Sequence, residues 1–164
     1  MNTENPFELF GLKPQLTINS AELDKAFQRI QLLCHPDKHA CPIEKKAALT
    51  VSAKISTLYS ELKTPIGCLN AILKLHHLDC IENLSKKNND IDTMQEVFTM
   101  QETLMALKLS NDADAIKQLY DKLKERLVAI EVAFMLAHKN NNIDELQKQA
   151  IRFSYFSKFQ KNML

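Results

Sequence analysis

Glycine and proline are scarce in this chain of 164 residues, which contains two glycines and five prolines. These residues mark most of the turns between strands, so their scarcity excludes a fold built from many short strands. The abundant residues are instead leucine, alanine, lysine, glutamine and glutamate, which favour helices. We therefore predict an all-α protein.

Long apolar runs and blocks of one charge are also absent. No apolar run approaches the roughly 18 residues that span a bilayer. Residues 1–6 are polar and include Glu4, so they have neither the apolar core of a signal peptide nor an Arg-rich transit pattern. The net charge is +1 with no basic block, which argues against a nucleic-acid partner. We expect a cytoplasmic protein without a membrane or nucleic-acid partner.

The sequence has no catalytic constellation: it lacks a glycine-rich phosphate loop and a nucleophile beside a base. We therefore expect this protein to bind partners and not to be an enzyme. Its four cysteines, Cys34, Cys41, Cys68 and Cys80, include no C-x-x-C pair. They are too few for a disulfide scaffold in a chain of this size, so we expect reduced thiols.

Two groups of ligand-type residues leave a zinc site open as an alternative. The groups are Cys34, His35, His39 and Cys41 in one loop, and His76, His77 and Cys80 further along the chain. Zinc requires four ligands that converge tetrahedrally, usually from paired short spacings, and the spacing here is weak. We expect neither a metal site nor a cofactor.

Capping signals and helical periodicity outline the first half of the chain. Asn5-Pro6-Phe7-Glu8 starts a short helix that Gly11 ends, and Asn19 with Glu22 starts a second. The apolar residues that follow form one helical face, and a second face repeats the spacing after a loop. The two faces are Leu23, Ala26, Phe27, Ile30, Leu33 and Cys34, and then Ala47, Val51, Ile55, Leu58, Tyr59 and Leu62. These patterns predict two antiparallel helices, followed by a helix from Thr64-Pro65 to about His76.

Residues 78–90 are mostly polar and predict a loop at a domain boundary. Three long helices are predicted after it, at about 91–109, 113–139 and 143–162. The middle helix has a seam that is nearly a heptad repeat, formed by Ile116, Leu119, Tyr120, Leu123, Leu127, Ile130, Phe134 and Ala137. Short connections make neighbouring helices antiparallel, which indicates a three-helix bundle.

The stretch Leu33-Cys34-His35-Pro36-Asp37-Lys38 ends the first helix of the predicted hairpin. Proline disfavours the helical conformation of the residue before it and lacks an N–H group, so the helix should end near His35. An imidazole and a carboxylate are then presented at the tip of a turn. The same string could be a plain helix-ending turn with a capping aspartate, and its context decides between the two interpretations.

With Lys25 and Arg29 facing outward on the first helix, this hairpin resembles a J-domain, the module that activates heat-shock ATPase chaperones. The chain also resembles iron–sulfur cluster co-chaperones of the HscB type. The resemblance rests on Leu9-Phe10-Gly11-Leu12, His35-Pro36-Asp37-Lys38 and the stretch from Thr64-Pro65 to His76. It implies an L-shaped molecule with a J-domain at 1–77, a linker at 78–90 and a scaffold-binding three-helix bundle at 91–164.

The resemblance implies that His35, Pro36, Asp37 and Lys38 dock on a heat-shock-cognate ATPase chaperone of the HscA type. Physically, Asp37 can accept charge-assisted hydrogen bonds from a partner arginine, and a rigid Pro36 reduces the ordering cost. Lys25 and Arg29 would steer the chain toward an acidic surface. Glu22 and Asp24 interrupt this basic stripe.

The helix at 91–109 carries two apolar stripes roughly 130° apart. They are Val97, Met100, Leu104 and Leu107 on one side, and Ile91, Met94, Phe98, Met105 and Leu109 on the other. Either both stripes are buried, one against each neighbouring helix, or the second stripe is an exposed partner patch.

By resemblance, the second stripe is where HscB-type proteins hold the cluster scaffold protein, of the IscU type. Met94, Phe98 and Glu102 fall on the matching positions. Gln95 is adjacent but departs from the pattern, as does Thr99. A last-helix aromatic completes the site, for which we choose Tyr155, with Phe153 and Phe156 as alternatives.

Two other functions share parts of this pattern. A generic J-domain co-chaperone would have the same hairpin but deliver misfolded clients, so it differs in what the bundle binds. A structural helical adaptor would have no ATPase partner at all.

Overall fold

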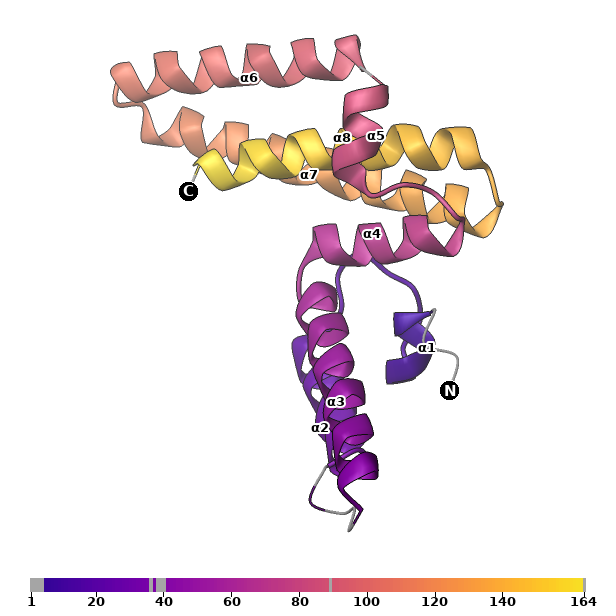
Figure 1. Ribbon diagram of the computed structural model, residues 1–164. Helices are drawn as coiled ribbons and strands as arrows, with labels where there is room; N and C mark the ends of the chain where they lie inside the picture. The colour runs from indigo at the N-terminus through magenta and orange to yellow at the C-terminus, as the bar shows by residue number, and fades with distance from the viewer. Residues whose placement is uncertain (1–4, 36, 38–40, 89, 164) are drawn as a thin grey trace. The chain divides into compact units, whose positions relative to one another are not determined.

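The computed structural model describes residues 5–35, 37, 41–88 and 90–163, and every regular element in these ranges is an α-helix (Figure 1). This confirms the predicted all-α class. The chain divides into two compact units, Met1–Leu78 and Asp79–Leu164. None of the helices in the described ranges combines the length and apolar character that crossing a bilayer requires.

The first unit contains α1 (Pro6–Phe10), α2 (Ser20–Leu33), α3 (Pro42–Leu62) and α4 (Pro65–Leu75). Their ends follow from local capping. The Asn5 side chain accepts a hydrogen bond from the Phe7 N–H at 3.0 Å, and Gly11 ends α1 at a φ of 67°. Asn19 and Thr64 cap α2 and α4 in the same way. The predicted starts of these helices are confirmed.

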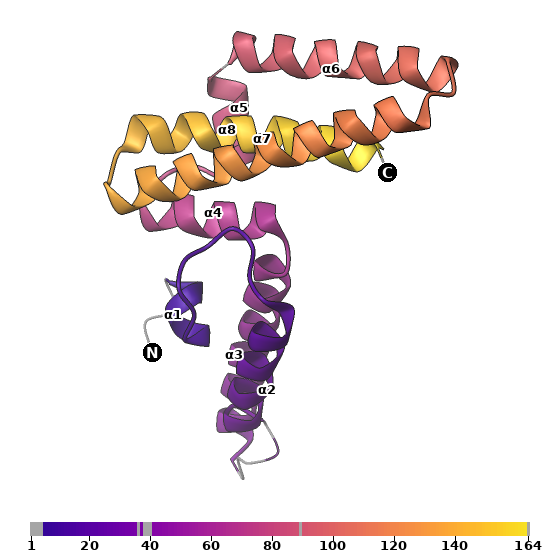
Figure 2. The same ribbon diagram turned by 180° about the vertical axis from the view of Figure 1, so that it is seen from behind.

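Helices α2 and α3 run antiparallel and pack along one side of each other (Figures 1 and 2). Leu23, Ala26 and Ile30 of α2 are buried, as are Ala48, Ile55 and Leu62 of α3. Beside this apolar contact the rings of Phe27 and Tyr59 stack with centroids 4.0 Å apart. The Tyr59 hydroxyl donates to Asp24 Oδ1 at 2.6 Å. The hairpin is therefore held by apolar and polar contacts together.

The predicted apolar faces are wrong toward the loop end of the hairpin, where Leu33 is 70% exposed and Val51 is 46% exposed. Polar contacts join the helices before that end: Ser52 Oγ donates to Gln31 Oε1 at 2.7 Å, and Gln31 Nε2 donates to Ser56 Oγ at 3.1 Å. Periodicity shows which residues share a face but not how far a neighbour covers it, so the outermost apolar residues stay in solvent.

The second unit contains α5 (Ile81–Lys87), α6 (Ile91–Leu109), α7 (Ala113–Lys139) and α8 (Ile143–Met163). Helices α7 and α8 lie side by side over most of their length, and α6 packs on this pair (Figures 1 and 2). The predicted seam of α7 supplies its buried residues, Leu119, Leu123, Leu127, Ile130, Phe134 and Ala137. Ile116 and Tyr120 of the same seam are half-buried.

Helix α5 corrects the prediction that residues 78–90 are all loop. Its two apolar residues, Ile81 and Leu84, are 2% and 5% exposed, and the helix packs against α8. Its other residues are polar, and Lys87 pairs with Asp79. A helix this short is stabilised mainly by tertiary packing, which composition does not show.

Candidate partner-binding sites

The connection between α2 and α3 presents His35 and Asp37 to solvent. Helix α2 ends at Leu33 with Cys34 as its C-cap, two residues before Pro36, as the proline predicts. The side chain of His35 is 51% exposed and that of Asp37 is 82% exposed. Pro36, Lys38 and His39 lie outside the described residues. Both described members of the predicted docking motif are therefore accessible.

A local contact orients the His35 ring. The backbone N–H of Asp37 donates to His35 Nδ1 at 3.3 Å, and Asp37 Oδ2 lies 3.5 Å from the same nitrogen. Both contacts involve Nδ1 and neither involves Nε2, and the Asp37 carboxylate remains largely exposed as an acceptor.

Lys25 and Arg29 are exposed one turn apart on α2. Asp24, which we expected to interrupt this basic stripe, instead faces α3, because it accepts from Tyr59 and lies 3.7 Å from Lys63 Nζ. The pKa of Lys63 is raised, chiefly by a hydrogen bond between Lys63 and Tyr59 and to a smaller extent by the negative charge of Asp24. Glu22 remains an exposed acid near the stripe.

The sequence did not indicate the exposed apolar side chains near the predicted docking motif. Leu32 and Leu33 at the end of α2 are 66% and 70% exposed, and Ile43 at the start of α3 is 80% exposed. The apolar periodicity of α2 assigns Leu33 to its buried face, and this assignment is wrong. Large apolar side chains that flank charged groups are suited to a partner contact because they exclude water from it.

Helix α6 separates its two apolar stripes into a buried and an exposed one. Val97 and Leu104 are 7% and 6% exposed, and Met100 and Leu107 are half-buried. The second stripe faces solvent over the whole helix: its exposed fractions are Ile91 71%, Met94 45%, Phe98 58%, Met105 66% and Leu109 90%. The alternative in which both stripes are buried is therefore wrong. Gln95 and Glu102 are also exposed.

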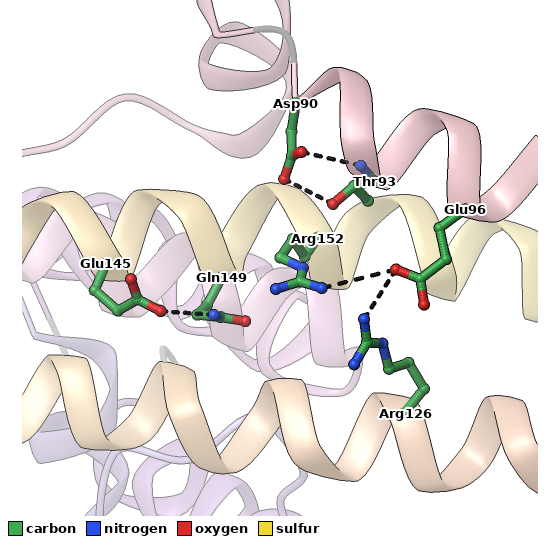
Figure 3. A network of polar contacts seen from close by, with 7 residues as sticks. All are labelled: Asp90, Thr93, Glu96, Arg126, Glu145, Gln149 and Arg152. Atoms are coloured by element: carbon green, nitrogen blue, oxygen red, sulfur yellow. Dashed lines mark hydrogen bonds and ion pairs between the residues drawn. The ribbon is translucent and has the colours of Figure 1, made fainter.

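Ion pairs fix the inner side of α6 (Figure 3). Glu96 Oε2 accepts from Arg126 Nη2 of α7 at 2.9 Å and lies 3.7 Å from Arg152 Nη2 of α8. Val97, next in sequence, is buried on this side. Because the inner side is committed to α7 and α8, the orientation of the outer stripe is set.

Asp90 fixes the start of α6. Its Oδ1 accepts from the Thr93 N–H at 3.0 Å, and the Thr93 hydroxyl donates to its Oδ2 at 2.7 Å. Burial disfavours the ionised carboxylate, but these hydrogen bonds and the charges of Arg152 and Lys148 outweigh burial and lower the pKa of Asp90. Asp90 thus anchors the first turn of α6, where the exposed stripe begins at Ile91.

Of the three candidate aromatics on α8, only Tyr155 has an accessible ring. Phe153 is 6% exposed and Phe156 is fully buried, whereas Tyr155 is half-buried. Phe156 packs in the core beside the Arg126 guanidinium, 5.9 Å from its ring centroid. The two alternatives to Tyr155 are therefore core residues.

The zinc alternative gains no support from the described residues, which contain no group of three or more histidine, cysteine or acidic side chains able to hold one ion. Residues His76, His77 and Cys80 are within the described ranges, so they do not converge in this way. His39 of the other group lies outside these ranges.

Comparisons with known proteins agree with this architecture. Residues 89–163 match the family model described as the HSCB C-terminal oligomerisation domain. A co-chaperone protein HscB homolog of Shewanella pealeana is 32% identical over 124 residues, 74% of this chain and 71% of the relative. The homolog of Shewanella halifaxensis is 29% identical over 166 residues, 97% of this chain and 94% of the relative.

Two solved structures have a similar fold over nearly the whole chain. The chaperone HscB from Vibrio cholerae superposes with a TM-score of 0.80 at 21% identity, covering 97% of this chain and 95% of that one. Human co-chaperone protein HscB gives 0.75 at 20% identity, covering 99% and 82%. On the sequence relationship, with the fold in agreement, this chain belongs to the HscB family of co-chaperones.

Proposed function

We propose that this chain stimulates ATP hydrolysis by a heat-shock-cognate chaperone of the HscA type and delivers to it an iron–sulfur cluster scaffold protein of the IscU type. In this proposal the first unit contacts the ATPase and the second unit holds the scaffold. The chain itself binds both partners and catalyses no reaction. The observation that carries the proposal is the exposed apolar outer face of α6, together with the accessible His35 and Asp37.

The ATPase contact rests on His35 and Asp37, with Pro36 and Lys38 completing the motif in the sequence. The Asp37 carboxylate suits a charge-assisted hydrogen bond with an arginine, and the exposed His35 imidazole suits a hydrogen bond with a polar group of the partner. Lys25 and Arg29 add long-range attraction to an acidic surface, so the contact should weaken as salt is raised. The exposed Leu32 and Ile43 supply apolar area beside these groups.

The scaffold contact rests on Met94, Phe98 and Glu102, with Gln95 beside them and Tyr155 from α8. A phenylalanine that is 58% exposed gains from burial against a partner, since full burial of such a side chain is worth about 1.5–3 kcal/mol. Methionine adapts its shape to the surface that it meets. Glu102 on the same face adds an acidic group for a basic side chain of the scaffold.

The binding of the purified scaffold protein to this chain tests the proposal. Met94→Ser with Phe98→Ser should weaken binding by at least about tenfold, because two apolar anchors are lost. Val128→Ser with Val132→Ser is the matched control, since these valines are 60% and 63% exposed on α7, and it should bind normally. If the α6 variant bound the scaffold as tightly as the wild type, the generic J-domain function would be favoured.

A further inference from the structure

Helix α7 carries a second exposed apolar stripe, which neither proposed contact uses. Val128, Val132 and Leu136 are 60%, 63% and 57% exposed. At about 100° per residue, their common direction lies about 160° around the helix from the buried Phe134. The stripe is therefore on the side of α7 that faces away from the core of its unit, where polar residues are expected.

The stripe is a continuous surface. Glu131, Met135 and Lys139 join the three apolar residues in lining one shallow hollow. Burial raises the pKa of Glu131, which shows that its carboxyl is partly withdrawn from water among these neighbours. A surface of this kind on the outer side of a helix marks an interaction site.

The charges at the two ends of the stripe are complementary under a two-fold operation. Glu125 lies seven residues before Val132 and Lys139 lies seven residues after it, and both are exposed on the same side of α7. Among the described residues, neither has an ion-pair partner within the chain. An antiparallel copy centred on Val132 would pair Val128 with Leu136 and Glu125 with Lys139, each of them twice.

We propose that this face of α7 is a self-association surface, on which a second copy of the chain packs antiparallel across a two-fold axis near Val132. The stripe lies within residues 89–163, and the proposal names a surface and a symmetry for self-association of that segment. It is independent of the contacts proposed for His35 and Phe98.

The expected dimer is weak. The 15 residues from Glu125 to Lys139 span about 21 Å of helix, and one helix pair of that length buries less than the roughly 1,200 Å² of a standard stable interface. The association should therefore depend on concentration and reverse on dilution. Such a dimer does not use the exposed stripe of α6.

Sedimentation equilibrium of the full chain between about 10 μM and about 1 mM tests the proposal, a range chosen for weak association. The average mass of the wild type should rise from the 18.8 kDa of one chain toward twice that value. Val132→Glu, which places two carboxylates against each other at the axis, should stay monomeric. Val51→Glu on α3 is the matched control, because Val51 is 46% exposed, and it should associate like the wild type.

Charge reversal tests the register. Glu125→Lys alone and Lys139→Glu alone each create two like-charge pairs and should weaken the dimer by about tenfold. The double variant should restore wild-type association, and the two single variants mixed together should form a heterodimer tighter than either homodimer. Restoration is specific to this antiparallel register.

Three results would overturn the proposal. The first is a wild type that remains monomeric at about 1 mM, where even weak specific dimers form. The second is association that Val132→Glu does not change. The third is a Val132→Glu variant that has the same average mass as the wild type but shows shifted amide NMR signals in residues 5–75. This result would mean that the first unit of the same chain covers the stripe.

Discussion

Arg126 on α7 donates a hydrogen bond to Glu96 on α6 at 2.9 Å, and this contact separates the two sides of α6. Glu96 is on the inner side, where Arg152 of α8 also approaches it. Met94 and Phe98, two residues before and after it, are on the outer side and exposed. One side of the helix therefore anchors it, which leaves the other side free to bind a partner.

Glu96→Gln should lower the free energy of unfolding by about 1 kcal/mol, the scale expected for half-exposed ion pairs. The change leaves two neighbouring arginines without their shared carboxylate. Urea denaturation followed by circular dichroism measures the difference.

Glu102→Gln is the matched control for that experiment. Glu102 is exposed on the outer side of α6, so its replacement should change the free energy of unfolding by less than about 0.5 kcal/mol. It should instead weaken scaffold binding. A Glu96→Gln variant as stable as the wild type would show that the inner ion pairs do not hold α6.

Tyr155→Ala and Phe156→Ala should behave in opposite ways. Phe156 is fully buried, so its truncation should cost about 3–5 kcal/mol of stability. Tyr155 is only half-buried, and its truncation should mainly reduce scaffold affinity. Thermal unfolding and isothermal titration calorimetry together separate the effects, and unchanged scaffold affinity in Tyr155→Ala would remove this residue from the proposed site.

Asp90 predicts a pH-dependent contribution to stability. Its pKa is lowered in the folded chain, so the ionised carboxylate stabilises the fold above its ordinary pKa of 3.8, and this stabilisation is lost as pH falls through the folded pKa. Asn also caps helices well, so Asp90→Asn removes mainly the charge. The difference in unfolding free energy between wild type and Asp90→Asn should be largest near neutral pH and should shrink below about pH 4.

Urea denaturation at a series of pH values measures this difference. Lys63 and Lys87 also have shifted pKa values, but both are raised above the ordinary lysine value of 10.5, so these side chains remain charged throughout the acid range. A difference that stays constant from neutral to acid pH would contradict the role assigned to the Asp90 charge.

Tyr59→Phe should weaken the hairpin of α2 and α3 without affecting its docking motif. The change removes the 2.6 Å hydrogen bond to Asp24 and should cost about 1 kcal/mol. The ring stack with Phe27 is kept. The variant should still stimulate the ATPase at temperatures where it is folded, and a loss of stimulation at full folding would place Tyr59 in the docking surface.

The long helices could be predicted from the sequence because their signals are local. Asn5, Asn19 and Thr64 cap helices through hydrogen bonds to residues two or three positions away. The seam of α7 repeats over many turns, so its buried side was evident from periodicity. Helix α5 could not be predicted, because its stability comes from Ile81 and Leu84 packing on α8, which is distant in sequence.

Exposure of the candidate sites followed from the sequence only in part. The two stripes on α6 left open whether one of them lacks a neighbour, and only the packing shows that Val97 faces inward and Phe98 outward. Leu33 fits the apolar period of α2, but no neighbouring helix in the described ranges buries it at this end of the hairpin, and its side chain stays 70% exposed. The sequence places Asp24 in the charged stripe of α2. Its hydrogen bond with Tyr59 could not be predicted, because the two residues are 35 positions apart and leave no local signal.

Stimulation of an HscA-type ATPase, measured with and without the scaffold protein, tests the central claim most directly. Wild type and scaffold together should stimulate hydrolysis more than the sum of their separate effects. Met94→Ser with Phe98→Ser should lose only this synergy, whereas His35→Gln should lose stimulation under both conditions. Equal stimulation by wild type and His35→Gln would contradict the account.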